Sequence, residues 1–368
     1  TLVGTIIIYV GGQDYITTLH PKDYNVSIVL PKSTDQKEAL LDKVQQVAQD
    51  SGLKKPSYTT YLYQSAFITK LTGNDVTVPM QRELESDTSI LTKSAGTITV
   101  INRQDYEKMT GEKIDLADDE TLVYGKNISL NKDKPLRVNG KDWKIKQLLS
   151  SNFTHGEIPN PNDVTMEQGL YMVVNDSKDV NLDVEHYYYI GVASETKGSK
   201  KFVEQVQLGL RDALDQEQAQ DGSYAMASDR HSAEKSYQEL TGTLLFIGVF
   251  LSVIFLLGAV LVIYYKQISE GYEDRDGFII LQKVGLDEKQ TRSTIRKQIL
   301  TVFFLPLIFA FLHIAAVFHM LRLIVALLGV TNIPLLIQTT LATCGVFLLT
   351  YILVFLLTSR SYRKIVAR

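Results

Sequence analysis

The chain has 368 residues, of which 45% are hydrophobic and 21% are charged, but these averages conceal two different parts. Residues 1–240 hold 26 Lys and Arg against 35 Asp and Glu, a net charge of −9, whereas residues 241–368 hold 12 against 6, a net charge of +6. The second part contains uncharged runs, 241–265 and 323–359, that are too long for a core helix of a soluble domain. A soluble single-domain enzyme is therefore excluded. The lone cysteine, Cys344, excludes an internal disulfide and a Cys-based zinc site.

The first segment, Thr1–Gly12, is apolar but too short to cross a bilayer, which needs about 20 residues in a helix. No basic region precedes it, so it does not resemble a signal peptide. We expect residues 1–12 to be the outer end of a transmembrane helix whose beginning is missing. The alternative is a buried first strand, because Ile6, Ile7, Ile8 and Val10 are β-branched.

The distribution of positive charge predicts the topology of the remaining membrane segments. The connection 266–298 contains seven Lys and Arg and the basic tail 359–368 contains four, whereas the short connection 322–334 contains one. Positively charged connections stay in the cytoplasm, so the first two are cytoplasmic and the third is extracellular. This places a large extracellular domain at 13–238 and predicts membrane helices at 239–265, 299–321 and 335–358.

Within residues 13–238 the apolar period alternates between that of strands and that of helices. The predicted helices are 35–51 and 200–216. The predicted strands are 25–30, 58–71, 97–102, 121–130, 170–174 and 187–192, and the Gly-, Pro-, Asn- and Asp-rich segments 110–120 and 154–163 are predicted loops. The predicted fold class is therefore an α-helical polytopic membrane protein with a large extracellular α+β domain.

The chain carries no phosphate-binding loop, no His-Glu-x-x-His zinc motif and no Gly-x-Ser-x-Gly elbow. We therefore expect no catalytic residue, no metal site and no cofactor in this chain. A nucleic-acid partner is not expected either. Residues that bind a ligand in the outer domain cannot be identified from the sequence, since alternating tyrosines such as Tyr61 and Tyr63 are common in sheet packing.

The connection 266–298 contains the most informative segment. A charged turn that includes Glu273 and Arg275 precedes a short apolar stripe formed by Phe278 and Leu281, flanked by Val284 and closed by Gly285. A short amphipathic helix beneath a membrane can dock into a cleft of a soluble partner. The alternative is a helix that only lies on the bilayer, although six acidic residues in 266–298 disfavour binding to anionic lipid.

Two features predict how the membrane helices pack. Gly248 and Ser252 form a pair of small residues four positions apart, which permits close approach of another helix. Pro306 should kink the second full membrane helix, because proline removes one helical hydrogen bond.

Three runs, Tyr264–Arg275, Phe278–Gly285 and Gln298–Leu307, closely resemble the FtsX-like permeases of ABC transporters. Among these, the chain is most similar to the bacitracin-resistance (BceB-type) permeases of Gram-positive bacteria. The resemblance covers residues 241–368 almost continuously. Over the outer domain it is looser and rests on Asp105–Gly111 and Thr121–Tyr124.

The resemblance implies that 266–286 is a coupling helix that contacts a separate ATPase subunit, and that this chain is the C-terminal portion of a ten-helix permease. Its coupling residues would be Glu273, Arg275, Phe278, Leu281, Val284 and Gly285. ATP and Mg would then be bound by the partner, a dimeric ABC ATPase. The resemblance also implies a sensor histidine kinase and a peptide antibiotic, or its complex with a lipid carrier, as partners alongside membrane lipid.

The sequence and the resemblance together predict the sensing and coupling part of a cell-membrane permease that protects against peptide antibiotics acting on the cell envelope. The first alternative is a macrolide-exporter-like or divisome-like FtsX permease that transmits force across the membrane. The second is a membrane-anchored receptor or enzyme that has no ATPase partner.

Overall fold

The computed structural model describes residues 2–30, 36–80, 83, 94–159, 166, 168–180, 182, 184, 186–214, 224–283, 288–326, 330 and 332–366. Side chains are not described for residues 13 and 14, for most residues between 263 and 303, or beyond 356. The chain divides into two compact units. The membrane-helix unit contains residues 1–11, 239–327 and 332–368, and the sheet unit contains residues 12–238 and 328–331.

The first helix, α1 (Leu2–Leu19), contains the segment for which a helix end and a buried strand were both considered. The strand alternative is wrong, because the apolar residues lie in a helix, which continues beyond Gly12 to Leu19. Residues up to Gly11 belong to the membrane-helix unit and those from Gly12 onward to the sheet unit. The observed helix α1 thus extends seven residues beyond the predicted segment 1–12.

The sheet unit is built on a mixed sheet, which has eleven strands over the described residues. The strand order is β11-β1-β10-β2-β5-β9-β6-β8-β7-β4-β3. Pairs β5–β9, β6–β8 and β4–β7 are parallel and the other pairs are antiparallel. The strands are β1 (Tyr24–Leu30), β2 (Ser57–Ile68), β3 (Lys70–Thr72), β4 (Asp75–Thr77), β5 (Gly96–Asn102), β6 (Glu120–Lys126), β7 (Leu136–Val138), β8 (Lys141–Leu148), β9 (Gly169–Val174), β10 (His186–Ala193) and β11 (Tyr224–Asp229).

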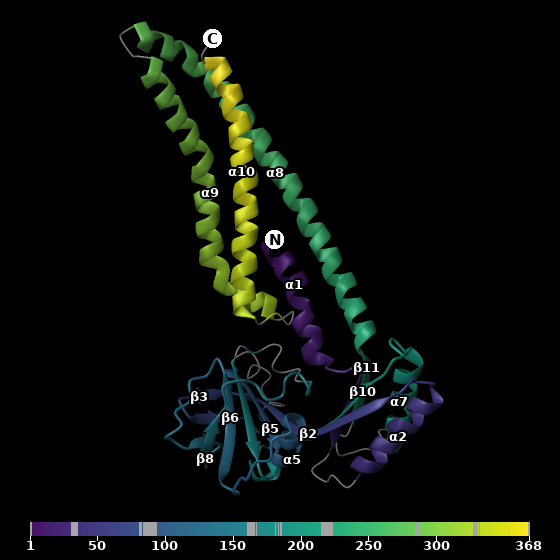
Figure 1. The fold of residues 1–368 in the computed structure, drawn as a ribbon. Coiled ribbons are helices and arrows are strands. Elements are labelled where there is room, and N and C mark those ends of the chain that lie inside the picture. The colour runs from purple at the N-terminus through teal and green to yellow at the C-terminus, as the bar shows by residue number, and fades with distance from the viewer. Residues whose placement is uncertain are drawn as a thin grey trace. The chain divides into compact units, whose positions relative to one another are not determined.

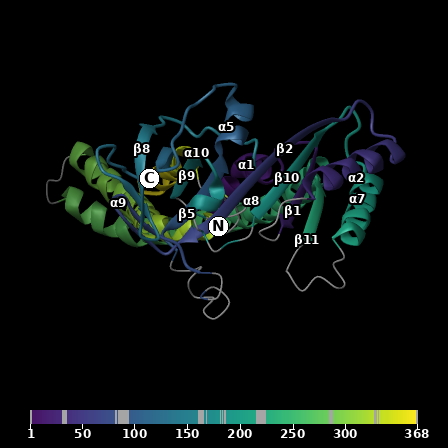
Figure 2. The same ribbon diagram turned by 90° about the horizontal axis from the view of Figure 1, so that it is seen from below.

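Two helices, α2 (Lys37–Asp50) and α7 (Lys200–Ala213), cover one face of the strands β11, β1, β10 and β2. Figures 1 and 2 show these two helices side by side next to that end of the sheet. Their apolar stripes, which include Val44, Phe202 and Val206, share one core with the inward side chains of β1 and β10. An amphipathic helix buries such a stripe against a sheet, and this burial accounts for the two helices that the period predicted.

The other half of the sheet curls around a second core, which contains the fully buried Trp143. Side chains from β4 and β7 share this core with side chains from β5 and β9, although several strands separate them in the sheet order. Strand β3 is the last strand in the sheet order, yet it follows β2 in the chain after a single residue. The edge of the sheet formed by β3 therefore lies close to the end of β2. Over the described residues, this half of the sheet encloses its own core, to which the short helix Ser177–Val180 adds Val180.

A third core lies on the opposite face of β2 and β10 and is rich in tyrosine. Tyr61 stacks on Tyr189 and Tyr63 stacks on Tyr187, with ring centroids 6.4 and 5.3 Å apart. Helix α5 (Arg103–Thr110) contributes Tyr106 to this core. Tyr61, Tyr63 and Tyr189 are buried, and their role in the described structure is the packing of the sheet.

Several differences separate the predicted from the observed elements. The strand predicted over 121–130 ends at Lys126, where Asn127 adopts a positive φ of 55°. The apolar period did not indicate α5, β4, β7 or β11, which are all short. Strand β8 was not predicted either, because only Trp143 and Ile145 of its residues are buried. The short helix 177–180 completes the described elements of the sheet unit.

The three longest helices of the described chain lie in the membrane-helix unit, except for the first nine residues of α8, which belong to the sheet unit. They are α8 (Arg230–Lys283), α9 (Glu288–Ala326) and α10 (Ile333–Val366). Each extends beyond the span predicted for it, so helix occupies most of the connections predicted at 266–298 and 322–334. In Figure 1 the last turns of α8 run across the direction of the rest of that helix before α9 begins.

Candidate functional site

Three helices of the described chain are long and apolar enough to cross a membrane, over Arg230–Lys266, Phe304–Ala326 and Ile333–Leu356. Their large apolar side chains point outward: Phe255 is 73% exposed and Leu349 is 68% exposed. Exposure of this kind is unfavourable in water but favourable in hydrocarbon. The fold is therefore that of a polytopic membrane protein with a large sheet domain, in agreement with the predicted fold class.

The predicted small pair on α8 lies where α8 meets α1. A Cβ built on Gly248 would lie 3.0 Å from Cγ2 of Thr5 and closer still to its Oγ1. The hydroxyl of Ser252 donates to the carbonyl oxygen of Gly248 at 2.6 Å. The hydroxyl of Thr5 likewise donates to the carbonyl oxygen of Leu2 at 3.0 Å. Both hydroxyls are thus satisfied within their own helices, and the two backbones can approach without an unpaired polar group.

An apolar cavity of about 590 Å³ opens beside this contact, with its walls supplied by α1, α8 and α10. The hydroxyls of Thr343 and Thr350, which line it, donate to the carbonyl oxygens of Thr339 and Val346, four residues earlier. The hydroxyl hydrogens of these two threonines are thus used within α10. The lining residues are Leu2, Ile6, Val249, Ser252, Val253, Leu256, Gln338, Thr339, Ala342, Thr343, Val346, Phe347 and Thr350.

Pro306 lies inside α9, one turn from an aromatic contact between α9 and α10. Phe304 packs against Tyr351 and Phe355, with ring centroids 6.5 and 5.4 Å apart. Leu307 and Tyr351 are the buried members of this small core. A proline in a helix leaves the carbonyl four residues earlier without its usual donor, so the predicted kink at Pro306 would act close to these aromatic rings.

The predicted coupling residues lie at the end of α8. Residues 270–276, predicted as a charged turn, are helical and continuous with the membrane span. Glu273 is exposed, whereas the side chains of Arg275, Phe278 and Leu281 are not described. Val284 and Gly285 lie outside the described residues. The coupling segment and the first turn of α8 at Arg230 therefore belong to a single helix.

A cluster of charged side chains at the start of α8 was not identified from the sequence. It surrounds a cavity of about 300 Å³ lined by Asp23, Lys197, Asp229, Arg230, His231 and Glu234. These residues come from the connection between α1 and β1, the segment before α7, the end of β11 and the beginning of α8. Residues so far apart in the sequence carry no local signal that they meet, and only the pairing of β1 with β11 and β10 brings them together.

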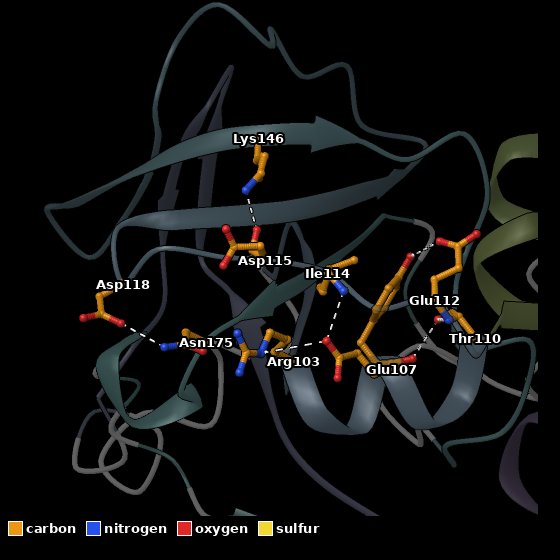
Figure 3. A network of polar contacts seen from close by, with 10 residues as sticks. Arg103, Glu107, Thr110, Glu112, Ile114, Asp115, Asp118, Lys146 and Asn175 are labelled. Carbon is orange, nitrogen blue, oxygen red and sulfur yellow. Dashed lines mark hydrogen bonds and ion pairs between the residues drawn. The ribbon is translucent and has the colours of Figure 1, made fainter.

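The motif at 105–111 forms α5 and its cap, and Figure 3 shows the polar contacts that follow it. Glu107 Oε1 accepts a hydrogen bond from the Ile114 amide at 3.0 Å, and Asn175 Nδ2 donates to Asp118 Oδ1 at 2.9 Å. Gly111 ends the helix with a φ of 75°, which glycine adopts without strain. The motif thus holds the loop that follows α5 against the sheet.

Asp105 fastens the same helix to the sheet. Its Oδ2 accepts a hydrogen bond from the Leu62 amide at 3.3 Å, at a point of β2 that has no partner in β5. Burial raises the pKa of Asp105, and the Leu62 amide and Lys108 partly oppose this change. The arrangement is a structural attachment of α5 to β2.

Comparison with known proteins identifies the C-terminal region. The model of the family described as "FtsX-like permease C-terminal" matches residues 249–367. The "Bacitracin export permease protein BceB" of Bacillus subtilis is 25% identical over 185 residues, which cover 50% of this chain and 26% of that protein. The protein of the same name from Halalkalibacterium halodurans is 24% identical over 219 residues, which cover 55% of this chain and 32% of that protein.

A third relative, the "ABC transporter permease protein YxdM" of Bacillus subtilis, is 31% identical over 75 residues, which cover 20% of this chain and 12% of that protein. The chain thus spans about a third or less of the length of these curated relatives. The family match covers most of α8 together with α9 and α10, and it includes two of the three candidate membrane spans in full. The C-terminal region of this chain, residues 249–367, is therefore an FtsX-like permease domain.

Proposed function

We propose that the chain is the C-terminal part of the permease subunit of an ABC transporter, in which ATP is hydrolysed, with Mg, by a separate dimeric ATPase subunit. The observation that carries this proposal is the match of residues 249–367 to FtsX-like permeases. It is supported by the printed name of one relative, an ABC transporter permease protein. The chain has no phosphate-binding loop of its own, so a partner must supply the energy.

Helix α8 supplies the mechanical connection in this proposal. Its last turns contain the segment proposed to contact the ATPase, and its first residue directly follows strand β11 of the sheet unit. Helix α8 runs without a break in the chain from Arg230 to Lys283, so a displacement of its last turns by the ATPase would be passed along the helix, through the change of direction before its end, to Arg230. In this way an event at the cytoplasmic ATPase would reach the large domain without any chemistry in this chain.

The proposed role of the transporter is resistance to peptide antibiotics that act on the cell envelope. Two relatives carry the name bacitracin export permease, and this name supports a related ligand, either a peptide or its complex with a lipid carrier of wall synthesis. The net charge of −9 on residues 1–240 would attract a cationic peptide. A sensor histidine kinase is the further proposed partner.

Deletion of the gene tests this role directly. We expect the inhibitory concentration of at least one wall-active peptide to fall, and the gene supplied in trans to restore it. No change across a panel of such peptides would remove the resistance proposal. Recovery of an ATPase with the tagged permease would still support the coupling proposal, whereas its failure would favour a receptor that works without an ATPase.

The proposed extracellular location of the sheet domain has a separate test. In a Cys344→Ala background, a cysteine at Lys55, whose side chain is 81% exposed, should react with a membrane-impermeant maleimide on intact cells. A cysteine at the exposed Lys297 of α9 should react only after permeabilisation. The reverse pattern would place the domain in the cytoplasm and overturn the topology.

A further inference from the structure

The two segments that leave the sheet for α1 and α8 are joined directly. Strands β1 and β11 pair in antiparallel register, with Tyr24 opposite Asp229. The amide of Arg230, the first residue of α8, donates to the carbonyl oxygen of Asp23 at 2.9 Å. The first turn of α8 therefore begins beside the segment that follows α1.

Asp229 satisfies the first turn of α8 with one carboxylate. Its Oδ1 accepts from the His231 amide at 3.1 Å, and its Oδ2 accepts from the amide and the hydroxyl of Ser232 at 3.2 and 2.6 Å. The first amides of a helix have no partner within the helix, and Asp preceding the first turn is among the best residues to cap them. Because Asp229 is only 6% exposed, water cannot easily replace these bonds.

Asp23 connects this turn to a second part of the domain. Its carbonyl oxygen bonds to Arg230, and its Oδ2 accepts from the Ser194 amide at 3.0 Å. Ser194 begins the segment 194–199, which we call the clamp segment. One residue thus holds both the start of α8 and the start of the clamp segment.

The clamp segment is held along its whole length. Ser194 Oγ donates to the Lys54 carbonyl oxygen at 2.8 Å, and the hydroxyl of Tyr24 donates to the Thr196 carbonyl oxygen at 2.7 Å. Its last residue, Ser199, donates its amide to the Tyr24 hydroxyl at 3.2 Å and caps α7 by accepting from the Phe202 amide. A continuous path of bonds and backbone therefore runs from Arg230 to the first turn of α7.

Helix α7 in turn shares its core with α2 and the strands beneath them. A helix attached to a domain by its backbone alone can pivot at the attachment, whereas a helix held at several points that do not lie on one line cannot. The start of α8 is held by the cap from Asp229 and by the bond to Asp23, and further along the helix Tyr237 stacks on Tyr15 of α1 with ring centroids 5.3 Å apart.

From this geometry we propose that Asp23 and Asp229 form a rigid anchor between the first turn of α8 and the layer made by α2 and α7. A change in the tilt of α8 is then passed to that layer and is not absorbed where β11 meets α8. This inference rests on the proposed function for one element alone, the partner ATPase that would move α8. The rigidity of the anchor is a property of this chain and is tested separately.

The test measures the distance between spin labels at Leu208 of α7 and Gln238 of α8, both of which are exposed. The 368-residue chain, with Cys344→Ala, is placed in lipid nanodiscs. We expect a narrow distance distribution, and we expect Asp229→Ala and Asp23→Ala each to broaden it about twofold, as when a fixed joint becomes a hinge. Asp229→Asn should keep it narrow, because Asn caps a helix about as well as Asp.

Glu195→Ala is the matched control, since Glu195 lies in the clamp segment and its exposed side chain pairs with Lys55. It should leave the distribution unchanged. If both alanine variants of the anchor keep a narrow distribution, the rigid anchor is wrong. Melting temperatures recorded with each variant separate a loosened joint from an unfolded domain, and Asp23→Ala decides the question if Asp229→Ala fails to fold.

The same variants in the complete permease test whether the anchor is used. Resistance should fall while the ATPase still copurifies, and Asp229→Asn should restore it. Undiminished resistance in variants whose distance distribution has broadened would overturn the transmission role. If deletion of the whole gene changes no resistance, the proposed function fails, and the distance measurement still decides the anchor.

Discussion

Gly248 of α8 lies against Thr5 of α1, with no space between them for a side chain. A Cβ at Gly248 would contact both Oγ1 and Cγ2 of Thr5, the latter at 3.0 Å. The two residues belong to helices that are more than 200 positions apart in the chain, and both lie in the membrane-helix unit. The two helices can approach this closely only because Gly248 has no side chain. Any larger residue at position 248 should therefore disturb the contact.

Replacement of Gly248 by Leu should separate α1 from α8 at this point. Overpacking of a tight contact costs about 1–3 kcal/mol, so we expect a lower melting temperature and reduced activity with normal membrane insertion. Gly258→Leu in the same helix is the control, because a Cβ there meets no heavy atom of the described residues within 4 Å. Equal behaviour of the two variants would show that the contact with Thr5 does not matter.

Phe278→Ala tests the segment proposed to contact the ATPase. Loss of an aromatic anchor at an interface commonly costs more than about 2 kcal/mol, which weakens association roughly thirtyfold. We expect the ATPase to be lost from the purified complex and resistance to fall. Ile280→Ala is the control, since Ile280 lies on the opposite side of the helix and is 61% exposed. Full copurification by Phe278→Ala would favour the helix that only lies on the bilayer.

Glu273→Lys tests the charged part of the same segment. Glu273 is exposed, so reversal of its charge should change the association rate and its dependence on salt more than the packing of the interface. We expect slower binding of the ATPase at low ionic strength and a smaller difference at high ionic strength. Stopped-flow measurement of binding at two salt concentrations would reveal this pattern, and an unchanged rate at both would contradict it.

Trp143 is the only tryptophan of the chain and is fully buried in the core of the curled half of the sheet. The ammonium group of Lys141 lies 4.3 Å from the ring centroid. Trp143→Ala should lower the free energy of unfolding by about 3–5 kcal/mol, because it removes a large buried side chain and leaves a cavity. Circular dichroism during denaturation measures this, with Leu148→Ala, on the same strand and 39% exposed, as the variant expected to change little.

The buried position of His20 should make the folded protein less stable in acid. Burial lowers its pKa below 6.5; Arg230 lowers it further, whereas Asp229 and Glu234 act in the opposite direction. The unfolded chain therefore binds the proton more readily than the folded one, and stability falls as the pH drops below 6.5 through the lowered pKa. His20→Gln should flatten the dependence of the melting temperature on pH in this range, and an unchanged slope would show that His20 does not contribute to it.

The sequence by itself determined the features that depend on local pattern. The uncharged run 241–265 marks a membrane helix because hydrocarbon demands about 20 apolar residues in succession, and the stripe of Phe202, Val206 and Leu210 marks α7 because a helix repeats every 3.6 residues. Strands β1, β5, β9 and β10 followed from the same kind of pattern, because buried strands are rich in β-branched and aromatic residues.

Only the tertiary structure decided which segments meet. Each of these meetings joins residues far apart in the chain: β1 with β10 and β11, β4 with β7, Gly248 with Thr5, and Arg230 with Asp23. Local periodicity shows which face of an element is buried but not what buries it, because many pairings satisfy the same apolar pattern. The choice among these pairings depends on the summed packing of the whole domain. The pairing of β1 with β11, for example, brings Asp23, which precedes β1, and Asp229, which ends β11, together at the start of α8.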